Sequence, residues 1–222
     1  MPGTDSVFPN SDNAAFGPVR NFVAGNAYEP NDVDRSDLDG DGDEDLVVYL
    51  SYTRASEGGL SVLLNGGKGA FGAPQAAPGP FWASSIVAVD LDGDGDNDLA
   101  ASDDSDNVTV STNDGDGAFA YRDAYLVGEQ AGQPQALTQA DFDGDGDVDI
   151  ATANAGAVNG RPENVSVLTN QGDGTLGNPK VFGAGVTTVD ITRARMNGDR
   201  KPDVVMANFA SDNVSVLLNT TR

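Results

Sequence analysis

An internal repeat with a period of about 50 residues constrains this chain more than any other feature. Each unit opens on a small cluster such as Ala70-Phe71-Gly72-Ala73-Pro74, passes through an acidic loop or its degenerate counterpart, and ends on an alternating strand. The units are residues 15–69, 70–117, 118–174 and 175–222. We therefore predict a single domain over residues 15–222, preceded by an N-terminal tail over residues 1–14.

Short strands, rather than helices, fill each unit. Runs such as Leu60 to Leu64 and Val214 to Leu218 alternate with the period of a strand that has one buried face. About four such strands per unit, separated by Gly, Asn and Asp turns, predict an all-β fold: a β-propeller with four blades of four antiparallel strands. A β-sandwich is the competing interpretation of the same pattern.

The two ends of the chain suggest how such a ring would close. The segment from Phe16 to Ala24 resembles a fourth strand, and the segment from Asn213 to Asn219 resembles a third strand. Pairing between them would remove two exposed strand edges. We predict that the N-terminal strand closes the ring by pairing with the C-terminal blade.

Three units carry the same acidic loop, Asp-x-Asp-Gly-Asp-Gly-Asp-x-Asp. Five neighbouring carboxylates repel one another, so ordering such a loop calls for a cation. Calcium accepts about six to eight oxygen ligands in a flexible shell, whereas magnesium demands a near-ideal octahedron and transition metals favour nitrogen or sulfur. A solvated acidic turn is the alternative. We predict three Ca²⁺ ions, bound by Asp37, Asp39, Asp41, Asp43, Asp45, Asp90, Asp92, Asp94, Asp96, Asp98, Asp141, Asp143, Asp145, Asp147 and Asp149.

Within each loop we assign side-chain oxygens to positions 1, 3, 5 and 9 and a backbone carbonyl to position 7. Gly40 and Gly42, at positions 4 and 6 of the first loop, permit the positive φ values that turn the carboxylates inward. The fourth unit departs from this pattern, with Arg195, Asn197, Asp199, Lys201 and Asp203 at the odd positions. We predict no calcium there, and we expect Arg195 to pair with Asp199 and Asp203 in place of an ion.

Composition narrows the classes of function. The formal net charge is −23, which disfavours binding to nucleic acid or to anionic membrane surfaces. Cysteine and histidine are both absent, which removes the thiol nucleophile, the commonest general base and the usual zinc ligands. No apolar run approaches the roughly 20 residues of a membrane span. We predict that the chain is not an enzyme and does not insert into a membrane.

Together, the cluster from Phe71 to Pro74, the acidic loops and the strand from Asn213 to Asn219 resemble the FG-GAP and VCBS repeats of integrin α-chain propellers and bacterial surface proteins. The resemblance covers residues 15–222. It implies a calcium-stabilised β-propeller used for extracellular adhesion or glycan binding, in some cases as an accessory module beside an enzyme. Propellers of this family usually carry seven blades, whereas four units fit this chain.

Ligand contacts are expected on the face opposite the acidic loops. Strand direction alternates within an antiparallel blade, so the first and third connections share one face and the other connections share the other. On this second face we select Trp82, Tyr52, Arg54 and Arg161 as candidate ligand-binding residues. Trp82 either stacks on a sugar ring or fills the space between blades.

These observations predict a calcium-binding extracellular β-propeller module for adhesion or lectin-like glycan recognition, in which calcium is structural. Extracellular calcium modules bind at about 10⁻⁴ to 10⁻³ M, above cytosolic calcium levels. The expected partner is a glycan or a cell-surface protein. The alternative is a non-catalytic scaffold or accessory segment of a larger surface protein or polysaccharide-active enzyme. A monomer is favoured, and a ring built from several chains is the alternative.

Overall fold

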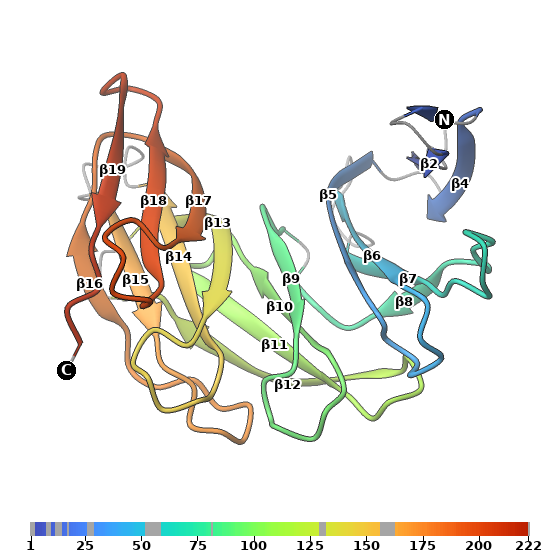
Figure 1. Cartoon of the computed structure of the whole chain (residues 1–222). Coiled ribbons are helices and arrows are strands. Elements are labelled where there is room, and N and C mark those ends of the chain that lie inside the picture. Colours follow the sequence, from blue (N-terminus) through green and yellow to red (C-terminus); the bar gives the residue numbers. More distant parts are fainter. Residues whose placement is uncertain are drawn as a thin grey trace.

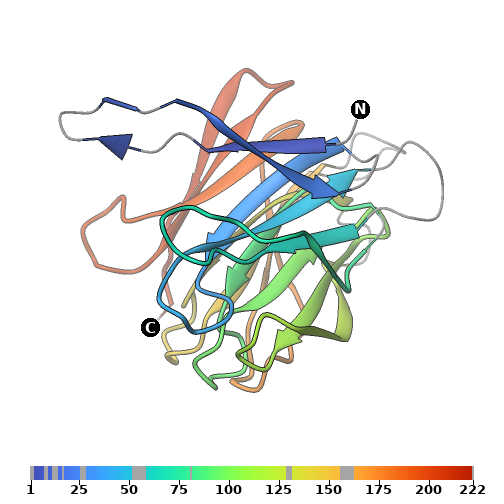
Figure 2. The same ribbon diagram turned by 90° about the vertical axis from the view of Figure 1, so that its right-hand side faces the viewer.

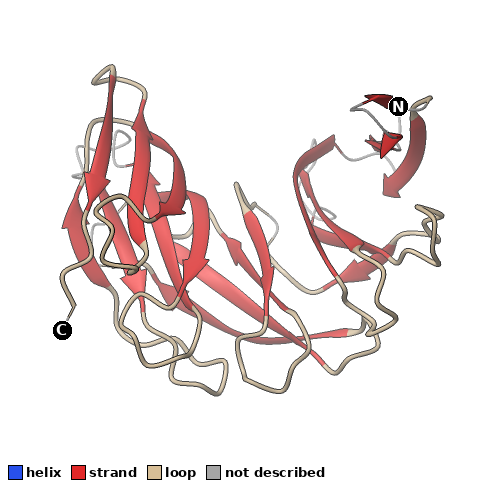
Figure 3. Ribbon diagram, viewed as in Figure 1, coloured by secondary structure: helices blue, strands red, loops and turns tan. Residues whose placement is uncertain are grey.

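The computed structural model consists of β-strands and the turns between them (Figure 3). It describes residues 3–7, 10–11, 15–16, 18–25, 29–51, 59–80, 82–128, 132–155 and 163–221, with side chains from residue 18 onward. Over these ranges, no helix is long and apolar enough to cross a membrane. The all-β prediction is confirmed.

Four antiparallel sheets form the blades of a β-propeller, and their strands are called a to d in chain order. Three blades have four described strands and the last has three. The first blade comprises β5 (Glu29–Ser36), β6 (Asp45–Ser51), β7 (Gly59–Leu63) and β8 (Gln75–Ala77). The second comprises β9 (Ile86–Val89), β10 (Asp98–Ser102), β11 (Asn107–Asn113) and β12 (Phe119–Leu126). The third comprises β13 (Gln133–Ala140), β14 (Asp149–Ala155), β15 (Asn164–Leu168) and β16 (Lys180–Gly183). The fourth comprises β17 (Thr188–Ala194), β18 (Asp203–Asn208) and β19 (Asn213–Leu217).

Successive blades stack through their a strands. Strand β5 contacts β9, β9 contacts β13, and β13 contacts β17. Apolar clusters fill the spaces between blades: Leu38, Val62 and Leu99 are buried between the first and second blades, and Leu91, Val110 and Leu168 between the second and third. The alternating apolar residues of the b and c strands thus form the core, as period-2 patterning predicts.

Blade boundaries are offset from sequence repeats. Strand d of each complete blade belongs to the unit after the one that supplies strands a, b and c. The pairs Val62↔Gln75, Val110↔Asp123 and Val167↔Lys180 therefore join residues of successive units, all with the same separation along the chain. A sequence unit is consequently one blade shifted by one strand.

The N-terminal residues form part of a further blade. Strand β1 (Gly3–Val7) pairs with β4 (Arg20–Gly25), and the Val7↔Arg20 pair has the separation of the c–d pairs in the complete blades. Between them, β2 (Asn10–Ser11) pairs with β3 (Ala15–Phe16), and the Asn10↔Phe16 pair reproduces Asn65↔Phe71. Residues 1–14, predicted as a tail, thus include a strand in the c position.

The predicted ring closure is wrong in this structure. Strand β4 pairs with β1, not with β19, and the described part of β19 pairs only with β18. The blades follow an open arc with the first and fourth blades at opposite ends (Figure 1), and the N-terminal strands lie alongside the first blade (Figure 2). Pairing of β4 with β1 is favoured over pairing with β19 because β1 is close to β4 along the chain, so closing the connection between them costs little entropy.

Candidate metal centres in the a–b loops

The carboxylate at position 9 holds each acidic loop in shape. Asp45 is fully buried at the start of β6, where its Oδ2 accepts a hydrogen bond of 2.8 Å from Leu38 N. Its Oδ1 accepts a second, of 2.7 Å, from Asn65 N in the c–d turn. The same two hydrogen bonds recur at Asp98, Asp149 and Asp203. Position 9 therefore ties the a–b loop to strand c in all four blades.

The carboxylate at position 1 folds the glycine-containing part of the loop. Asp37 accepts hydrogen bonds of 2.9 Å from Gly40 N and 3.0 Å from Gly42 N, and both glycines have positive φ values, 73° and 91°. Asp90 and Asp141 do the same in the second and third loops. The sequence-based expectation that these glycines allow the inward turn is confirmed for the first loop.

Three groups of carboxylates have oxygens close enough to share one cation. Within each group the ligand atoms lie within 4.8 Å of one another. The groups are Asp37, Asp39 and Asp41; Asp90, Asp92 and Asp94; and Asp141, Asp143 and Asp149. All the donors are oxygen, the ligand type of Ca²⁺ and Mg²⁺. Each of the three predicted loops can thus hold a metal ion.

The third group contains an oxygen that lacks a protein partner. Asp143 Oδ1 is shielded from solvent and has no hydrogen-bond partner in the described structure. A buried carboxylate oxygen left in this way is costly unless a donor or a cation satisfies it. The residues present in this loop therefore fit a bound cation.

Other predicted ligands lie outside these groups. The side chain at position 7 points to the c–d turn, so that a Cβ added to Gly172 would lie 2.6 Å from Asp147 Oδ2. In all three loops both oxygens of the position-9 carboxylate accept backbone hydrogen bonds, and Asp149 alone of the three also belongs to a carboxylate group. The side chain at position 7 therefore packs against the c–d turn, and the backbone carbonyl at this position remains a predicted ligand. The residues at position 7 are Asp43, Asp96 and Asp147.

The fourth loop keeps the two hydrogen bonds to position 9, which we call the frame of the loop, and lacks the acidic group. Asp203 accepts hydrogen bonds from Met196 N (2.7 Å) and Asn219 N (2.8 Å), as in the other loops. Arg200 replaces a glycine and still takes a positive φ of 73°. The expected pairing of Arg195 with Asp199 and Asp203 is wrong: within the described ranges, the single ion pair joins Arg35 and Glu44.

The pKa of the position-9 carboxyl is shifted in opposite directions in the acidic loops and in the fourth loop. Burial raises the pKa of Asp98 and of Asp149 to about 6, and nearby loop carboxylates act in the same direction. In contrast, hydrogen bonds from the backbone N–H groups of Asn219 and Met196 lower the pKa of Asp203. Without a cation, the position-9 carboxyl of these two loops therefore keeps its proton up to a higher pH than that of the fourth loop.

An asparagine that we did not predict joins each metal loop to the next blade. Asn113 Nδ2 donates a hydrogen bond of 2.8 Å to the carbonyl of Leu38 in the first loop. Asn170 and Asn219 make the equivalent bonds to Leu91 and Phe142, at 2.7 and 2.8 Å. The repeated Asn at the end of each c strand was visible in the sequence, but only the stacking of blades reveals its partner. The order of each loop is thus linked to the interface between blades.

The opposite face carries one described ligand candidate. The carbonyl of Trp82, in the d–a connection after the first blade, accepts a hydrogen bond of 3.1 Å from Asp104 N in the b–c connection of the second. Trp82 is 47% exposed, so it is not a buried filler between blades. Tyr52, Arg54 and Arg161 lie outside the described residues.

Comparison with known proteins agrees with this architecture. A family model described as "FG-GAP-like repeat" matches residues 37–101 and 90–152, the segments with the acidic loops. The chain belongs to the FG-GAP-like repeat family, whose repeats are typical of extracellular proteins.

Similar solved structures include two of BBS1N in complex with ARL6DN, one soaked with mercury and one with lead. Both are 14% identical to this chain, with TM-scores of 0.39 and 0.36. They cover 88% and 89% of this chain and 79% and 81% of their own. Curated proteins yielded no significant match.

Proposed function

We propose that this chain is a calcium-binding extracellular recognition module in which calcium holds the blades together and takes no part in chemistry. The observation that carries the proposal is the contrast among the a–b loops. The fourth loop keeps the position-9 hydrogen bonds without aspartates at positions 1 and 3. The shape set by those bonds therefore does not require the acidic groups. Cation binding then explains why carboxylates that repel one another are gathered in the other three loops.

Calcium is favoured over magnesium by the density of protein oxygens. Asp37, Asp39 and Asp41 approach one another closely, and a backbone carbonyl is available at position 7. Magnesium keeps several waters and rarely accepts so many protein ligands, whereas calcium tolerates an irregular shell. A bound ion would supply positive charge that offsets the repulsion within each loop.

Calcium would also stabilise the interfaces between blades. Each acidic loop accepts a hydrogen bond from an asparagine of the following blade, as Leu38 does from Asn113. An ion that orders the loop would fix this carbonyl and so strengthen blade stacking. This linkage supports a structural role for calcium, in a chain that we also propose to be non-enzymatic.

The test is thermal unfolding followed by circular dichroism, in millimolar calcium and in chelator, with calcium counted by atomic absorption. At calcium concentrations 100-fold above Kd, each site adds about 2.7 kcal/mol to the free energy of unfolding. We expect a large rise in Tm and three ions per chain, and a much smaller rise in magnesium. An unchanged Tm would overturn the structural role of calcium.

Recognition is proposed for the face with the b–c and d–a connections. The exposed indole of Trp82 offers a flat apolar surface with a polar edge, the kind of surface on which a sugar ring stacks. A glycan array with the calcium-loaded chain tests this, with Trp82→Ala as the variant. Tyr121→Ala is the matched control, because Tyr121 is 56% exposed on the outer strand β12. Loss of binding in the tyrosine variant alone would contradict the assignment, and a full array without binders would favour the non-catalytic scaffold.

A further inference from the structure

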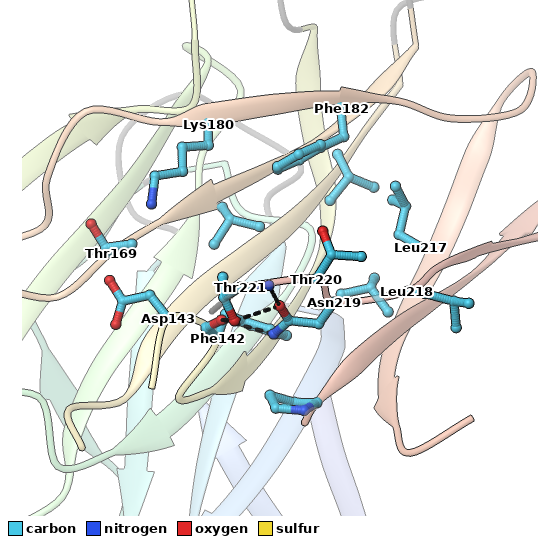
Figure 4. Close-up of a pocket in the computed structure, with 14 residues that line it drawn as sticks. Phe142, Asp143, Thr169, Lys180, Phe182, Leu217, Leu218, Asn219, Thr220 and Thr221 are labelled. Atoms are coloured by element: carbon cyan, nitrogen blue, oxygen red, sulfur yellow. Dashed lines mark hydrogen bonds between the residues drawn. The ribbon is translucent and has the colours of Figure 1, made fainter. Parts of the chain in front are cut away.

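One hydrogen bond recurs at all three interfaces between the four blades. An asparagine at the end of strand c donates to the carbonyl at position 2 of the a–b loop in the preceding blade. The pairs are Asn113 with Leu38, Asn170 with Leu91, and Asn219 with Phe142. Figure 4 shows the last of these pairs beside the pocket between the third and fourth blades. Because this bond is common to the interfaces, it does not make one pair of loops differ from another.

An additional hydrogen bond joins the first two acidic loops directly. Asn97, at position 8 of the second loop, donates from its Nδ2 to the carbonyl of Asp37, at position 1 of the first loop, over 3.2 Å. Position 8 of the third loop is Val148, which has no amide to donate. Within the described ranges, no hydrogen bond runs between the second and third loops. The first interface is therefore the one in which two acidic loops share a hydrogen bond of their own.

The backbone around position 8 is otherwise the same at both interfaces. The asparagine of strand c donates to the carbonyl at position 8, over 3.2 Å in the second blade and 3.1 Å in the third. The glycine at position 4 of the preceding loop faces a carbonyl of the c–d turn, and a Cβ added to this glycine would lie 3.8 Å from that oxygen at both interfaces. The glycine and carbonyl pairs are Gly40 with Gly115 and Gly93 with Gly172. The side chain at position 8 is thus what distinguishes the two interfaces here.

Both ends of the Asn97 bond lie within candidate metal centres. Asp37 belongs to the first group of carboxylates that can share a cation. Asn97 lies between Asp96, whose carbonyl is a predicted ligand, and Asp98, whose carboxylate holds the second loop in shape. An ion that orders one of these loops also fixes one end of the bond. Ordering the other loop then costs less conformational entropy, so the two binding steps favour each other.

We propose that Asn97 couples cation binding at the first and second loops, so that an ion in either loop raises the affinity of the other. The coupling rests on the calcium binding proposed above. It is reciprocal, because one free energy links the two binding steps. Cations in neighbouring loops also repel each other, and salt screens part of this repulsion. The change Asn97→Val is neutral in charge, so it removes the hydrogen bond and leaves the repulsion as it was.

The experiment is calorimetric titration of the full chain with calcium, in about 0.15 M KCl to screen the repulsion. The third loop is disabled throughout by changing its aspartates at positions 1 and 3 to asparagine. Three chains are then compared: one with the first two loops intact, and two in which the same change disables one of them. The coupling factor is the overall affinity for two ions divided by the product of the two single-loop affinities. The substitutions are Asp37→Asn with Asp39→Asn, Asp90→Asn with Asp92→Asn, and Asp141→Asn with Asp143→Asn.

Asn97→Val in all three chains should lower the coupling factor by about three- to tenfold, the effect of losing one hydrogen bond. A variant that merely loosens the fold lowers the single-loop affinities and leaves the coupling factor unchanged, so an unchanged factor would overturn the proposal. Independent binding of two ions to the chain that retains Asn97 would overturn it as well. No calcium binding at any loop would instead count against the proposed function.

The converse change should create coupling between the second and third loops. Because the backbone around position 8 repeats, the amide introduced by Val148→Asn should reach the carbonyl of Asp90, as Asn97 reaches that of Asp37. With the first loop disabled, the coupling factor of the other two loops should rise about threefold. Val148→Leu is the matched control, because leucine has the shape of asparagine without its amide. No rise with asparagine, or an equal rise with leucine, would overturn the role given to the amide.

Discussion

The third and fourth a–b loops share one frame and differ in charge. Asp149 and Asp203 accept the same two backbone hydrogen bonds and start equivalent strands. Only the third loop brings three carboxylates together and leaves Asp143 Oδ1 without a partner. Hydrogen bonding at position 9 therefore builds the loop, while the acids at the other positions add a site for a cation.

The largest effect should follow from removing the shared frame. Asp149→Ala leaves two buried backbone N–H groups without an acceptor, which we expect to lower the free energy of unfolding in chelator by about 2 to 4 kcal/mol. Asp203→Ala leaves two partly buried N–H groups without one, and should cost less, about 1 to 3 kcal/mol. Only Asp149→Ala should also reduce the number of bound calcium ions, from three to two. Urea unfolding and calcium counting measure the two effects, and a stable Asp203→Ala variant would contradict the common frame.

In the absence of metal, the stability of the folded chain should depend on pH through the position-9 carboxyls. The pKa of Asp98 and of Asp149 is raised in the folded chain to about 6, so the folded state binds protons more tightly than the unfolded state. In chelator, stability should therefore fall as pH rises from about 4 to 6, by on the order of 1 kcal/mol per pH unit. Asp203, whose pKa is lowered, contributes the opposite sign at lower pH. Urea midpoints across this range test the prediction, and Asp98→Asn with Asp149→Asn should flatten the profile.

A smaller effect is expected at the link between loop and blade. Asn170→Ala removes the hydrogen bonds to the carbonyls of Leu91, in the preceding blade, and Val148, and should cost about 1 to 2 kcal/mol. Asn65→Ala is the matched control, because among the described residues Asn65 Nδ2 makes just the counterpart of the Val148 bond, to Glu44 in the first acidic loop, and no bond to another blade. Calcium affinity should fall further in Asn170→Ala than in Asn65→Ala, because only Asn170 also ties a loop to the neighbouring blade. Equal affinities would show that loop order and blade stacking are not linked.

The smallest effect should come from restoring the fourth loop. Arg195→Asp, Asn197→Asp, Arg200→Gly and Lys201→Asp together recreate the acidic pattern on the existing frame. With a Kd near 10⁻³ M and calcium tenfold above it, the added site should contribute about 1.4 kcal/mol. Arg200→Gly alone is the control, since it relieves a positive φ without adding charge. Titration calorimetry should count four ions; a count of three would mean that the frame alone does not complete a site.

Local sequence predicted the blades well, because each blade is built from strands that are short and close along the chain. The alternation in the strand from Val214 to Leu218, the glycines at Gly40 and Gly42, and the spacing of the acids all act within a few residues. The aspartates at positions 1 and 3 were recognised as a group for the same reason. Position 9 was expected as a ligand, whereas the structure shows its oxygens occupied by Leu38 N and Asn65 N in the first loop.

The repeat, the four blades, the acidic loops and the one loop that lacks their charge could be predicted from the sequence, because all of these depend on residue type and spacing. Features that depend on contacts between units became visible only in the folded structure. It showed that Asn113 reaches the loop of the preceding blade, that β1 takes the place expected for the C-terminal strand, and that Val214 and Val216 remain uncovered. The pattern of a strand predicts that it has a buried face and a paired edge, but it does not predict which residues pack there. The partner depends on the entropy of closing the chain and on which surfaces the arc brings together.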